Sequence, residues 1–184
     1  MTQTQNSIAI IGRGLAGNLA ALALSKSLGA DWRILQLGTS DGPLEDSFYG
    51  SVTAPTAYNF LRSVGLEEPR LLLGSATTFS LGSHFKHWVG GASWMQCHHS
   101  PLPTLATAPL RHQLTRLKLD LEPLLVSAQV AKAGRFAHPP EDPNTILSRA
   151  EYGYQFDPME WAALLDHDVA DSTVERIESE VRSI

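Results

Sequence analysis

The hexapeptide at residues 12–17, GRGLAG, constrains the fold of this chain more than any other segment, because it spaces its glycines as G-x-G-x-x-G. It follows the apolar run 7–11 and precedes a Leu- and Ala-rich stretch that continues to Leu28, a pattern typical of a strand, a tight turn and a helix. The run 33–37 predicts a second strand, which ends at Gly38. A strand, a helix and another strand in this order form a βαβ unit with a right-handed crossover.

The glycines of the hexapeptide have separate roles in a dinucleotide-binding turn. Gly12 permits the tight turn, Gly14 lets the backbone approach a pyrophosphate, and Gly17 lets the helix pack closely on the strand. The N-terminus of the helix adds free N–H donors and a partial positive charge, both of which favour phosphate. This context predicts dinucleotide binding, with a plain tight turn that holds no ligand as the alternative.

One element of the usual dinucleotide site is missing from the sequence. An acid that binds the ribose is expected at the end of the second strand, and this position is Gly38. Asp41 or Glu45 could compensate from the following loop. No arginine follows Leu37 to meet a 2′-phosphate, so NADP is the least expected dinucleotide.

The complete pattern predicts an α/β protein with a Rossmann-type βαβ core and a partly helical insertion. We expect the run 7–11 to be buried on both faces of a parallel sheet. Further elements are predicted as helices at 55–65, 67–73 and, in two pieces, 110–134, an extended segment at 77–89, a strand at 152–157, a helix at 158–169 and the start of a strand at 174–181. Asp157 is expected to cap the helix that begins at Pro158.

Composition narrows the class of protein. With 43% hydrophobic and 18% charged residues the chain is globular, and its net charge of −5 without a basic stripe argues against nucleic-acid binding. Cys97 is the only cysteine among the 184 residues, which fits a reducing compartment. The first residues lack the basic start of a signal peptide, and the apolar stretch 15–24 is too short to span a bilayer. These features predict a cytoplasmic protein without a membrane contact.

Several further side chains could belong to a functional site, but each is expected to have a structural or solvent-exposed role. His84, His87, His98 and His99 lack the spacing of a metal site, so no metal is expected. Trp88 and Trp94 could line an aromatic pocket, but core packing is the commoner use. Asp166, Asp168 and Asp171 are expected to face solvent.

Ordered motifs along the chain resemble the flavin-dependent halogenases of the tryptophan halogenase type. Besides the glycine hexapeptide, residues 50–55 (GSVTAP) look like the family's G-E-A-T-I-P loop, and residues 60–68 (FLRSVGLEE) are similar to F-L-x-x-L-G-L-x-E. Residues 76–88 (ATTFSLGSHFKHW) resemble A-T-F-K-L-G-I-x-F-x-x-W, and residues 154–157 (YQFD) look like Y-H-F-D.

The resemblance implies an FAD-binding fold in which reduced flavin and oxygen oxidise a halide. The resulting hypohalous acid then passes along a tunnel to a lysine beside an indole-like substrate. At the lysine position this chain has Ser80, and Ser51 replaces the glutamate of the G-E-A-T-I-P loop. Lys86 is out of register with the lysine position. The family's later W-x-W-x-I-P segment has no counterpart among these residues, so we expect a truncated member, its N-terminal part only, that cannot halogenate.

The resemblance also implies a division of the chain and a set of site residues. Residues 1–75 and 156–184 would form the FAD-binding core, and residues 76–155 an insertion that resembles the substrate side. An unpaired edge of the incomplete sheet could promote self-association. Arg13 would add a charge to the pyrophosphate site, and residues 53–55 would border the isoalloxazine. The cofactor-binding candidates are Gly12, Arg13, Gly14, Leu15, Ala16, Gly17, Thr53, Ala54 and Pro55.

The expected partners are an indole-like small molecule and a separate flavin reductase, both implied by the resemblance. No catalytic residue is assigned, because Ser80 stands at the lysine position. Two alternatives stay open at this point. The chain could be a non-catalytic remnant or interaction module that binds no flavin, or a fragment of another FAD- or NAD-linked monooxygenase.

Overall fold

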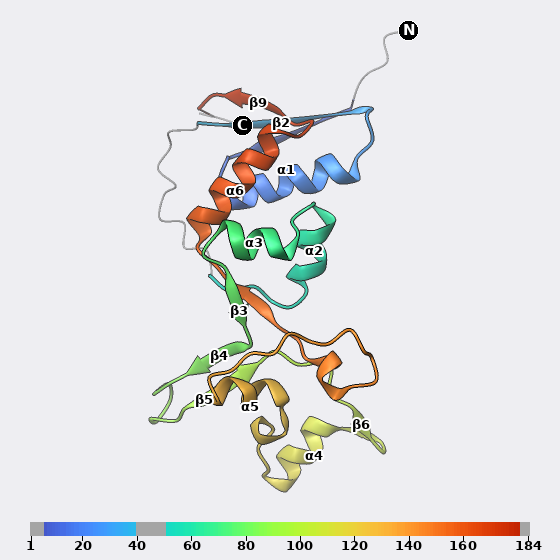
Figure 1. Cartoon of the computed structure of the whole chain (residues 1–184), viewed down its shortest axis with the longest axis vertical. Coiled ribbons are helices and arrows are strands. Elements are labelled where there is room, and N and C mark those ends of the chain that lie inside the picture. Colours follow the sequence, from blue (N-terminus) through green and yellow to red (C-terminus); the bar gives the residue numbers. More distant parts are fainter. Residues whose placement is uncertain (1–5, 40–50, 181–184) are drawn as a thin grey trace. The chain divides into compact units, whose positions relative to one another are not determined.

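The computed structural model describes residues 6–39 and 51–180, which divide into two units (Figure 1). Of the described residues, the first unit contains 6–39, Ser51, Tyr58–Thr78 and 156–180. The second unit contains Val52–Ala57 and Phe79–Gln155. Each unit has its own strands and helices and is described separately.

A three-stranded parallel sheet forms the centre of the first unit, with the strand order β1-β2-β9. The strands are β1 (Asn6–Ile11), β2 (Trp32–Gly38) and β9 (Glu175–Glu178). Helix α1 (Leu15–Ser27) connects β1 to β2, so the predicted βαβ unit is present. The α/β class with an incomplete sheet is confirmed, because β1 and β9 each pair with a single strand among the described residues.

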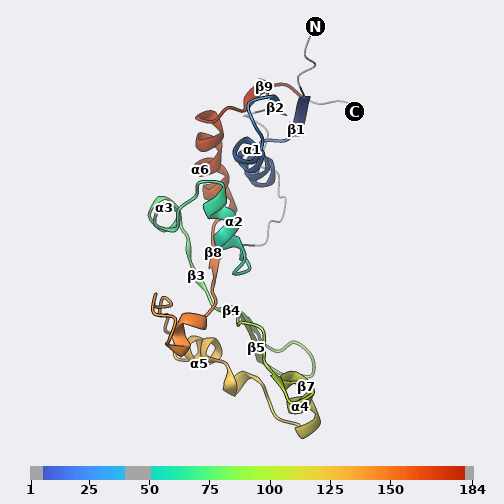
Figure 2. The ribbon, with the colours of Figure 1, turned by 90° about the vertical axis from the view of Figure 1, so that its right-hand side faces the viewer.

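Two helices cover one face of this sheet. Helix α6 (Pro158–Ala170) lies beside α1 in both views (Figures 1 and 2). Small residues allow the close approach, since Ala21 of α1 and Ala162 of α6 are buried. Larger buried side chains complete the core, namely Leu15, Leu22, Ile34, Trp161, Leu165 and Val169. Removing this apolar area from water supplies most of the stability of the unit, at about 25 cal/mol per Å².

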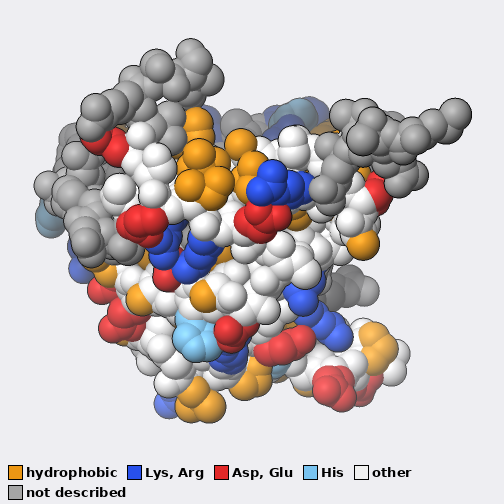
Figure 3. Space-filling view, turned by 90° about the horizontal axis from the view of Figure 1, so that it is seen from above, with side chains coloured by type: hydrophobic (Ala, Val, Ile, Leu, Met, Phe, Trp, Pro, Cys, Tyr) orange, Lys and Arg blue, Asp and Glu red, His pale blue; other side chains and the backbone are white. Residues whose placement is uncertain are grey.

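The other face of the sheet has no helical layer in the described part of the chain. Ile11 is 52% exposed and Ile177 is 39% exposed, and both align with Leu37 in the strand register. Figure 3 views the first unit from the side of this sheet, and hydrophobic side chains gather there between charged ones. The prediction that the run 7–11 is buried on both faces is therefore wrong for the described residues, because helices cover only one face.

Two short helices and the start of α6 complete the first unit. Helices α2 (Ala57–Ser63) and α3 (Glu68–Gly74) begin close to the predicted positions. Asp157 caps α6 as predicted, because its Oδ1 accepts hydrogen bonds from the backbone N–H groups of Met159 (2.8 Å) and Glu160 (3.4 Å). The Glu160 carboxylate instead accepts a hydrogen bond from the Ala76 backbone N–H, which ties α6 to the segment after α3.

The second unit consists of short strand pairs and helices. Strands β3 (Thr78–Ser80) and β8 (Gly153–Gln155) pair, as do β4 (Gly82–Phe85) and β5 (Trp94–Cys97), and β6 (Thr104–Leu105) and β7 (Ala108–Pro109). The helical segments are α4 (Leu110–Leu117), α5 (Val126–Lys132) and the 3₁₀ turns η1 (Glu122–Leu124) and η2 (Ile146–Arg149). The two helical pieces predicted within 110–134 correspond to α4 and α5, with η1 at Pro123 between them (Figure 2).

Aromatic side chains form two clusters in the second unit. Phe79 stacks on Phe136 with ring centroids 4.1 Å apart, and Tyr152 meets Phe79 edge-on. Trp94 stacks on Phe85 of the β4–β5 hairpin. The core-packing interpretation of the tryptophans is wrong, since Trp88 is 66% exposed and Trp94 lies on the surface of the hairpin, where the strands are too few to enclose them.

Candidate functional site

The glycine turn between β1 and α1 has the conformation that the hexapeptide predicts. Gly12 has a φ of +111°, in the region that glycine adopts without strain. Its backbone N–H donates to the Leu37 carbonyl at 2.7 Å, which fixes the turn against the end of β2. The chain then reverses into α1, whose first residue is Leu15.

Gly17 lies where the helix passes closest to the turn. A Cβ atom at this position would be 3.0 Å from the carbonyl carbon of Gly12 and closer still to its oxygen, well inside the separation that Cβ atoms keep. Because the obstructing atoms belong to the backbone, no side-chain rotation relieves the contact. Glycine at 17 is therefore a condition for α1 to start directly above the turn.

The N-terminus of α1 offers backbone N–H donors that no side chain of the described residues caps. Gly14 is the N-cap residue with extended backbone (φ −78°, ψ −175°), and no side-chain cap is formed there. The first turn contains no acidic residue, and the Gly14 carbonyl accepts the first helical bond, from Asn18 N at 2.9 Å. The first-turn N–H groups and the positive end of this 13-residue helix favour an anion such as phosphate.

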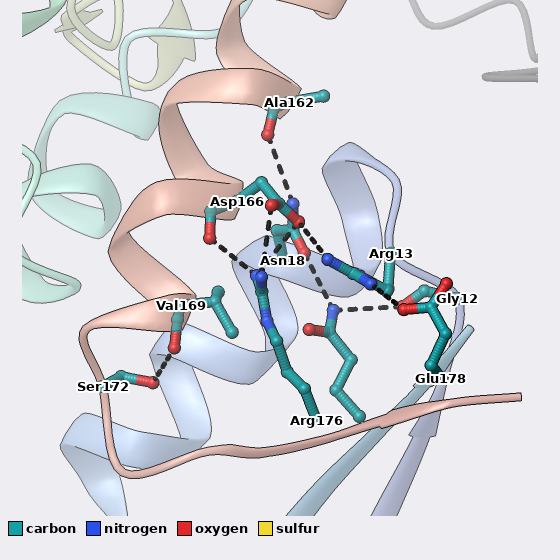
Figure 4. Close-up of polar contacts among 10 residues, drawn as sticks. Gly12, Arg13, Asn18, Ala162, Asp166, Val169, Ser172, Arg176 and Glu178 are labelled. Atoms are coloured by element: carbon teal, nitrogen blue, oxygen red, sulfur yellow. Dashed lines mark hydrogen bonds and ion pairs between the residues drawn. The ribbon is translucent and has the colours of Figure 1, made fainter. Parts of the chain in front are cut away.

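A buried amide network, which no sequence pattern predicted, fixes the turn. Gln36 and Asn18 are both fully buried. Gln36 Nε2 donates to the Gly12 carbonyl (3.1 Å) and to Asn18 Oδ1 (2.8 Å), and Asn18 Nδ2 donates to the Ala162 carbonyl (3.3 Å) (Figure 4). The network links β2, the turn, α1 and α6. Its only sequence signal is a polar residue within each of two apolar stretches.

Charged side chains surround the same turn. Arg13 donates to the Glu178 carboxylate at 2.7 Å and to Asp166 at 3.4 Å. Arg176 donates to both Asp166 oxygens, at 3.0 and 3.2 Å, and to the Asp166 carbonyl at 2.6 Å (Figure 4). The expectation that Asp166 only faces solvent is wrong, because α6 presents it to two arginines.

Asp168 also differs from expectation, whereas Asp171 does not. The Asp168 carboxylate pairs with Arg70 of α3, and its hydrogen bonds raise the pKa of the Arg70 guanidinium above its ordinary value. Asp171 is exposed and contacts His167 one helical turn away. The ion pair of Asp168 connects α6 to α3, a contact between elements far apart in sequence that no local pattern indicates.

The space beside Gly38, where the ribose-binding acid is expected, is filled by the side chain of Arg13. A Cβ atom at Gly38 would lie 3.0 Å from Cγ of Arg13, so the arginine stem crosses directly over this strand end. The Gly38 carbonyl accepts a hydrogen bond from Ser179 N at 3.4 Å. Asp41 and Glu45, the acids expected to compensate, lie outside the described residues, as does Gly50 of the G-E-A-T-I-P-like loop.

Residues 53–55 belong to the second unit. Thr53 pairs with Tyr154 twice, since its N–H donates to the Tyr154 carbonyl (2.8 Å) and its Oγ1 accepts from Tyr154 N (2.9 Å). Ala54 is exposed and Pro55 is half-buried. The structure thus places Gly12, Arg13, Gly14, Leu15, Ala16 and Gly17 together in the first unit, and Thr53, Ala54 and Pro55 together in the second.

Ser80 is buried at the end of β3 and lies 3.4 Å from both the backbone N and the carbonyl oxygen of Gly82. Gly82 has a φ of +138° and packs directly against the backbone of β5. Lys86 is exposed beyond the end of β4. Within the described part of the second unit, the position that resembles the family's lysine therefore carries a hydroxyl that hydrogen-bonds to the Gly82 backbone.

The titratable groups next to β5 are perturbed by burial. Burial raises the pKa of the Cys97 thiol, and burial lowers the pKa of the adjacent His98 imidazole. Both shifts favour the neutral form of the group, the thiol of Cys97 and the uncharged imidazole of His98. Across residues 6–39 and 51–180, no group of three His, Cys, Asp or Glu side chains is arranged to hold a metal ion. No helix in these ranges has the length and apolar character to cross a membrane.

Comparison with protein families identifies the relatives of this chain. The family model described as tryptophan halogenase matches residues 7–184. The chain belongs to the tryptophan halogenase family. The resemblance carried by the ordered sequence motifs is thereby confirmed. No curated protein matches this member of the family.

Solved structures share the fold of this tryptophan halogenase family member. The flavin-dependent halogenase BrvH from Brevundimonas sp. BAL3 is 22% identical with a TM-score of 0.78, over 97% of this chain and 36% of that chain. Xcc4156 from Xanthomonas campestris, also a flavin-dependent halogenase, is 25% identical with a TM-score of 0.77, over 98% and 36%. The tryptophan 6-halogenase SttH from Streptomyces toxytricini is 19% identical with a TM-score of 0.80, over 99% and 39%. The 184 residues thus span little more than a third of the length of these proteins.

Proposed function

We propose that the first unit binds the pyrophosphate of FAD and forms part of the flavin-binding core of a flavin-dependent halogenase. The observation that carries this proposal is the fit of Gly17 against the Gly12 carbonyl, directly below the uncapped N-terminus of α1. A turn built only to reverse the chain has no need for a helix start this close to the strand. A phosphate needs it, because the helix N–H groups must approach its oxygens.

The residues present fit this group. The first-turn N–H groups of α1 would donate to the phosphates, and the buried network of Gln36 and Asn18 holds the turn rigid for them. Bound FAD supplies redox chemistry, in which reduced flavin and oxygen oxidise a halide. Thr53, Ala54 and Pro55 would border the isoalloxazine, and residues 76–155 would form the substrate side.

Halogenation by these 184 residues alone is not expected. The position that resembles the family's lysine is Ser80, whose hydroxyl can hydrogen-bond but cannot form a haloamine or carry a positive charge. Ser80 is also buried and held close to Gly82. An indole-like substrate and a separate flavin reductase are the partners that we propose.

The test is a titration of the purified chain with FAD, FMN and ADP. Quenching of flavin fluorescence monitors the binding of FAD and FMN, and calorimetry measures the binding of ADP. Pyrophosphate binding predicts that FAD binds, that ADP competes with it, and that FMN, which lacks the second phosphate and the adenosine, binds at least about tenfold more weakly. Equal affinity for FMN and FAD without competition by ADP would contradict the proposal. The absence of binding to all three would also contradict it.

A second candidate function is a protein module that binds no flavin. The observation in its favour is Gly38, since this strand end has no acid of its own and the Arg13 side chain lies across it. The same titration separates the two, because the module predicts colourless protein after purification and no response to FAD. A parallel titration with NADH tests the remaining alternative, a fragment of an NAD-linked monooxygenase, which predicts nicotinamide binding.

A further inference from the structure

The carboxyl ends of two neighbouring strands meet beside the glycine turn. In the parallel pairing of β2 with β9, Gly38 is the register partner of Glu178. Adjacent strands lie about 4.8 Å apart, so the backbone of Glu178 stands next to the position where a ribose-binding acid is expected. In an open parallel sheet, ligands bind outside this carboxyl edge.

Arg13 connects Gly38 to Glu178. Its stem passes 3.0 Å from where a Cβ atom of residue 38 would be, and its guanidinium donates to the Glu178 carboxylate at 2.7 Å. A second guanidinium nitrogen lies 3.4 Å from Asp166, so carboxylates from β9 and α6 fix the arginine on two sides. An acidic side chain at position 38 would collide with this arrangement. The observed position of the Arg13 side chain therefore requires a residue without a side chain at position 38.

We propose that Glu178 takes the role of the absent acid at Gly38 and accepts a hydrogen bond from the ribose 2′-hydroxyl of the adenosine half of FAD. Arg13 is then a positioning residue, which holds the carboxylate at the strand edge. This inference rests on the proposed binding of FAD. A carboxylate has two oxygens with about four lone-pair sites, so Glu178 can accept from Arg13 and from a hydroxyl together.

Glu178 suits this role better than the other acid of the cluster. Its side chain is 57% exposed, so a ligand can reach it. The Asp166 carboxylate accepts two hydrogen bonds from Arg176 and one from Arg13, which occupies most of its capacity. Asp166 also projects from α6 and not from the carboxyl end of a strand. Position and exposure both favour Glu178.

The experiment compares ADP with 2′-deoxy-ADP as ligands of the purified chain, by calorimetry. A hydrogen bond to a charged group predicts that the wild type binds ADP about ten- to a hundredfold more tightly than 2′-deoxy-ADP. Glu178→Ala is expected to weaken ADP binding and leave 2′-deoxy-ADP binding unchanged, so the ratio falls toward one. Glu178→Gln, which keeps the volume and a neutral acceptor, should give an intermediate ratio and serves if the alanine variant folds poorly.

The matched control is Glu175→Ala on the same strand. Glu175 is 51% exposed and pairs with Arg33, but it stands at the amino end of β9, away from the turn. Its loss should leave the ratio unchanged. A wild-type ratio retained in both Glu178 variants, or an equal loss of ADP and 2′-deoxy-ADP affinity in them, would overturn the inference while FAD binding stands. Failure of the wild type to bind ADP at all overturns the proposed function, and this inference with it.

Discussion

Replacement of Gly17 by alanine tests the central contact of the site. The new Cβ atom would lie 3.0 Å from the Gly12 carbonyl carbon and closer still to its oxygen, whereas Cβ atoms keep at least 3.0 Å from such neighbours. The Gly12 carbonyl cannot rotate away freely, because it accepts a hydrogen bond from the buried Gln36 amide. Relief therefore requires α1 to move away from the turn by more than about half an ångström.

The cost follows from the packing of α1. Forcing an extra carbon into a closed contact costs about 1–3 kcal/mol. Alanine is the better helix former by about 1 kcal/mol, which offsets part of that cost. Since the obstruction is backbone and not a flexible side chain, we expect the upper part of that range, about 2–3 kcal/mol, so that Gly17→Ala lowers the free energy of unfolding by about 1–2 kcal/mol after the helix gain. The same movement displaces the N–H groups at the start of α1, so ADP affinity should fall as well.

Urea unfolding followed by circular dichroism measures the stability, and ADP calorimetry measures the site. With a typical urea dependence, the loss corresponds to a midpoint lower by about 0.5–1 M. Gly74→Ala is the matched control, because a Cβ atom at this helical glycine would meet only Leu164, at an ordinary 3.9 Å. The control should be neutral or slightly stabilising. If Gly17→Ala were as stable as Gly74→Ala and bound ADP normally, the close-packing explanation of the turn would be refuted.

Three further predictions concern the interior and the charges. Asn18→Ala removes an amide that is fully buried and bonded to two neighbours, so we expect a loss of about 1–3 kcal/mol in urea unfolding, against less than about 0.5 kcal/mol for the exposed Ser27→Ala in the same helix. The hydrogen bond from Arg33 lowers the pKa of Glu175 from 4.5, so its stabilisation is complete above about pH 4.5 and is lost as the pH falls through the lowered folded pKa. The melting temperature of the wild type should therefore exceed that of Glu175→Gln at pH 6, and the difference should shrink as the pH falls below 4.5; a constant difference would contradict this. Burial raises the pKa of Cys97, so the native thiol should react with Ellman's reagent at least about tenfold more slowly than in 6 M guanidinium chloride, and equal rates would show that it is exposed.

Local patterns were sufficient to predict much of the first unit. The run 7–11, the glycine hexapeptide and the run 33–37 correspond to β1, the turn and β2, because hydrophobic period and glycine spacing are properties of neighbouring residues. The cap at Asp157 was predicted for the same reason, since its partners lie two and three residues away. The β6–β7 hairpin was not predicted, because strands of two residues carry too little pattern.

Tertiary structure alone decided how the turn is held. The sequence by itself determined the βαβ unit and the glycines at 12 and 17, because backbone geometry restricts those positions to glycine. The pairing of Gln36 with Asn18, and of Arg13 with Glu178, joins residues 18 and 165 positions apart. Such contacts depend on which strand lies next to β2 and on where α6 packs. Local sequence patterns predict neither the strand that lies next to β2 nor the packing of α6, because both are decided by the burial of apolar surface over the whole unit.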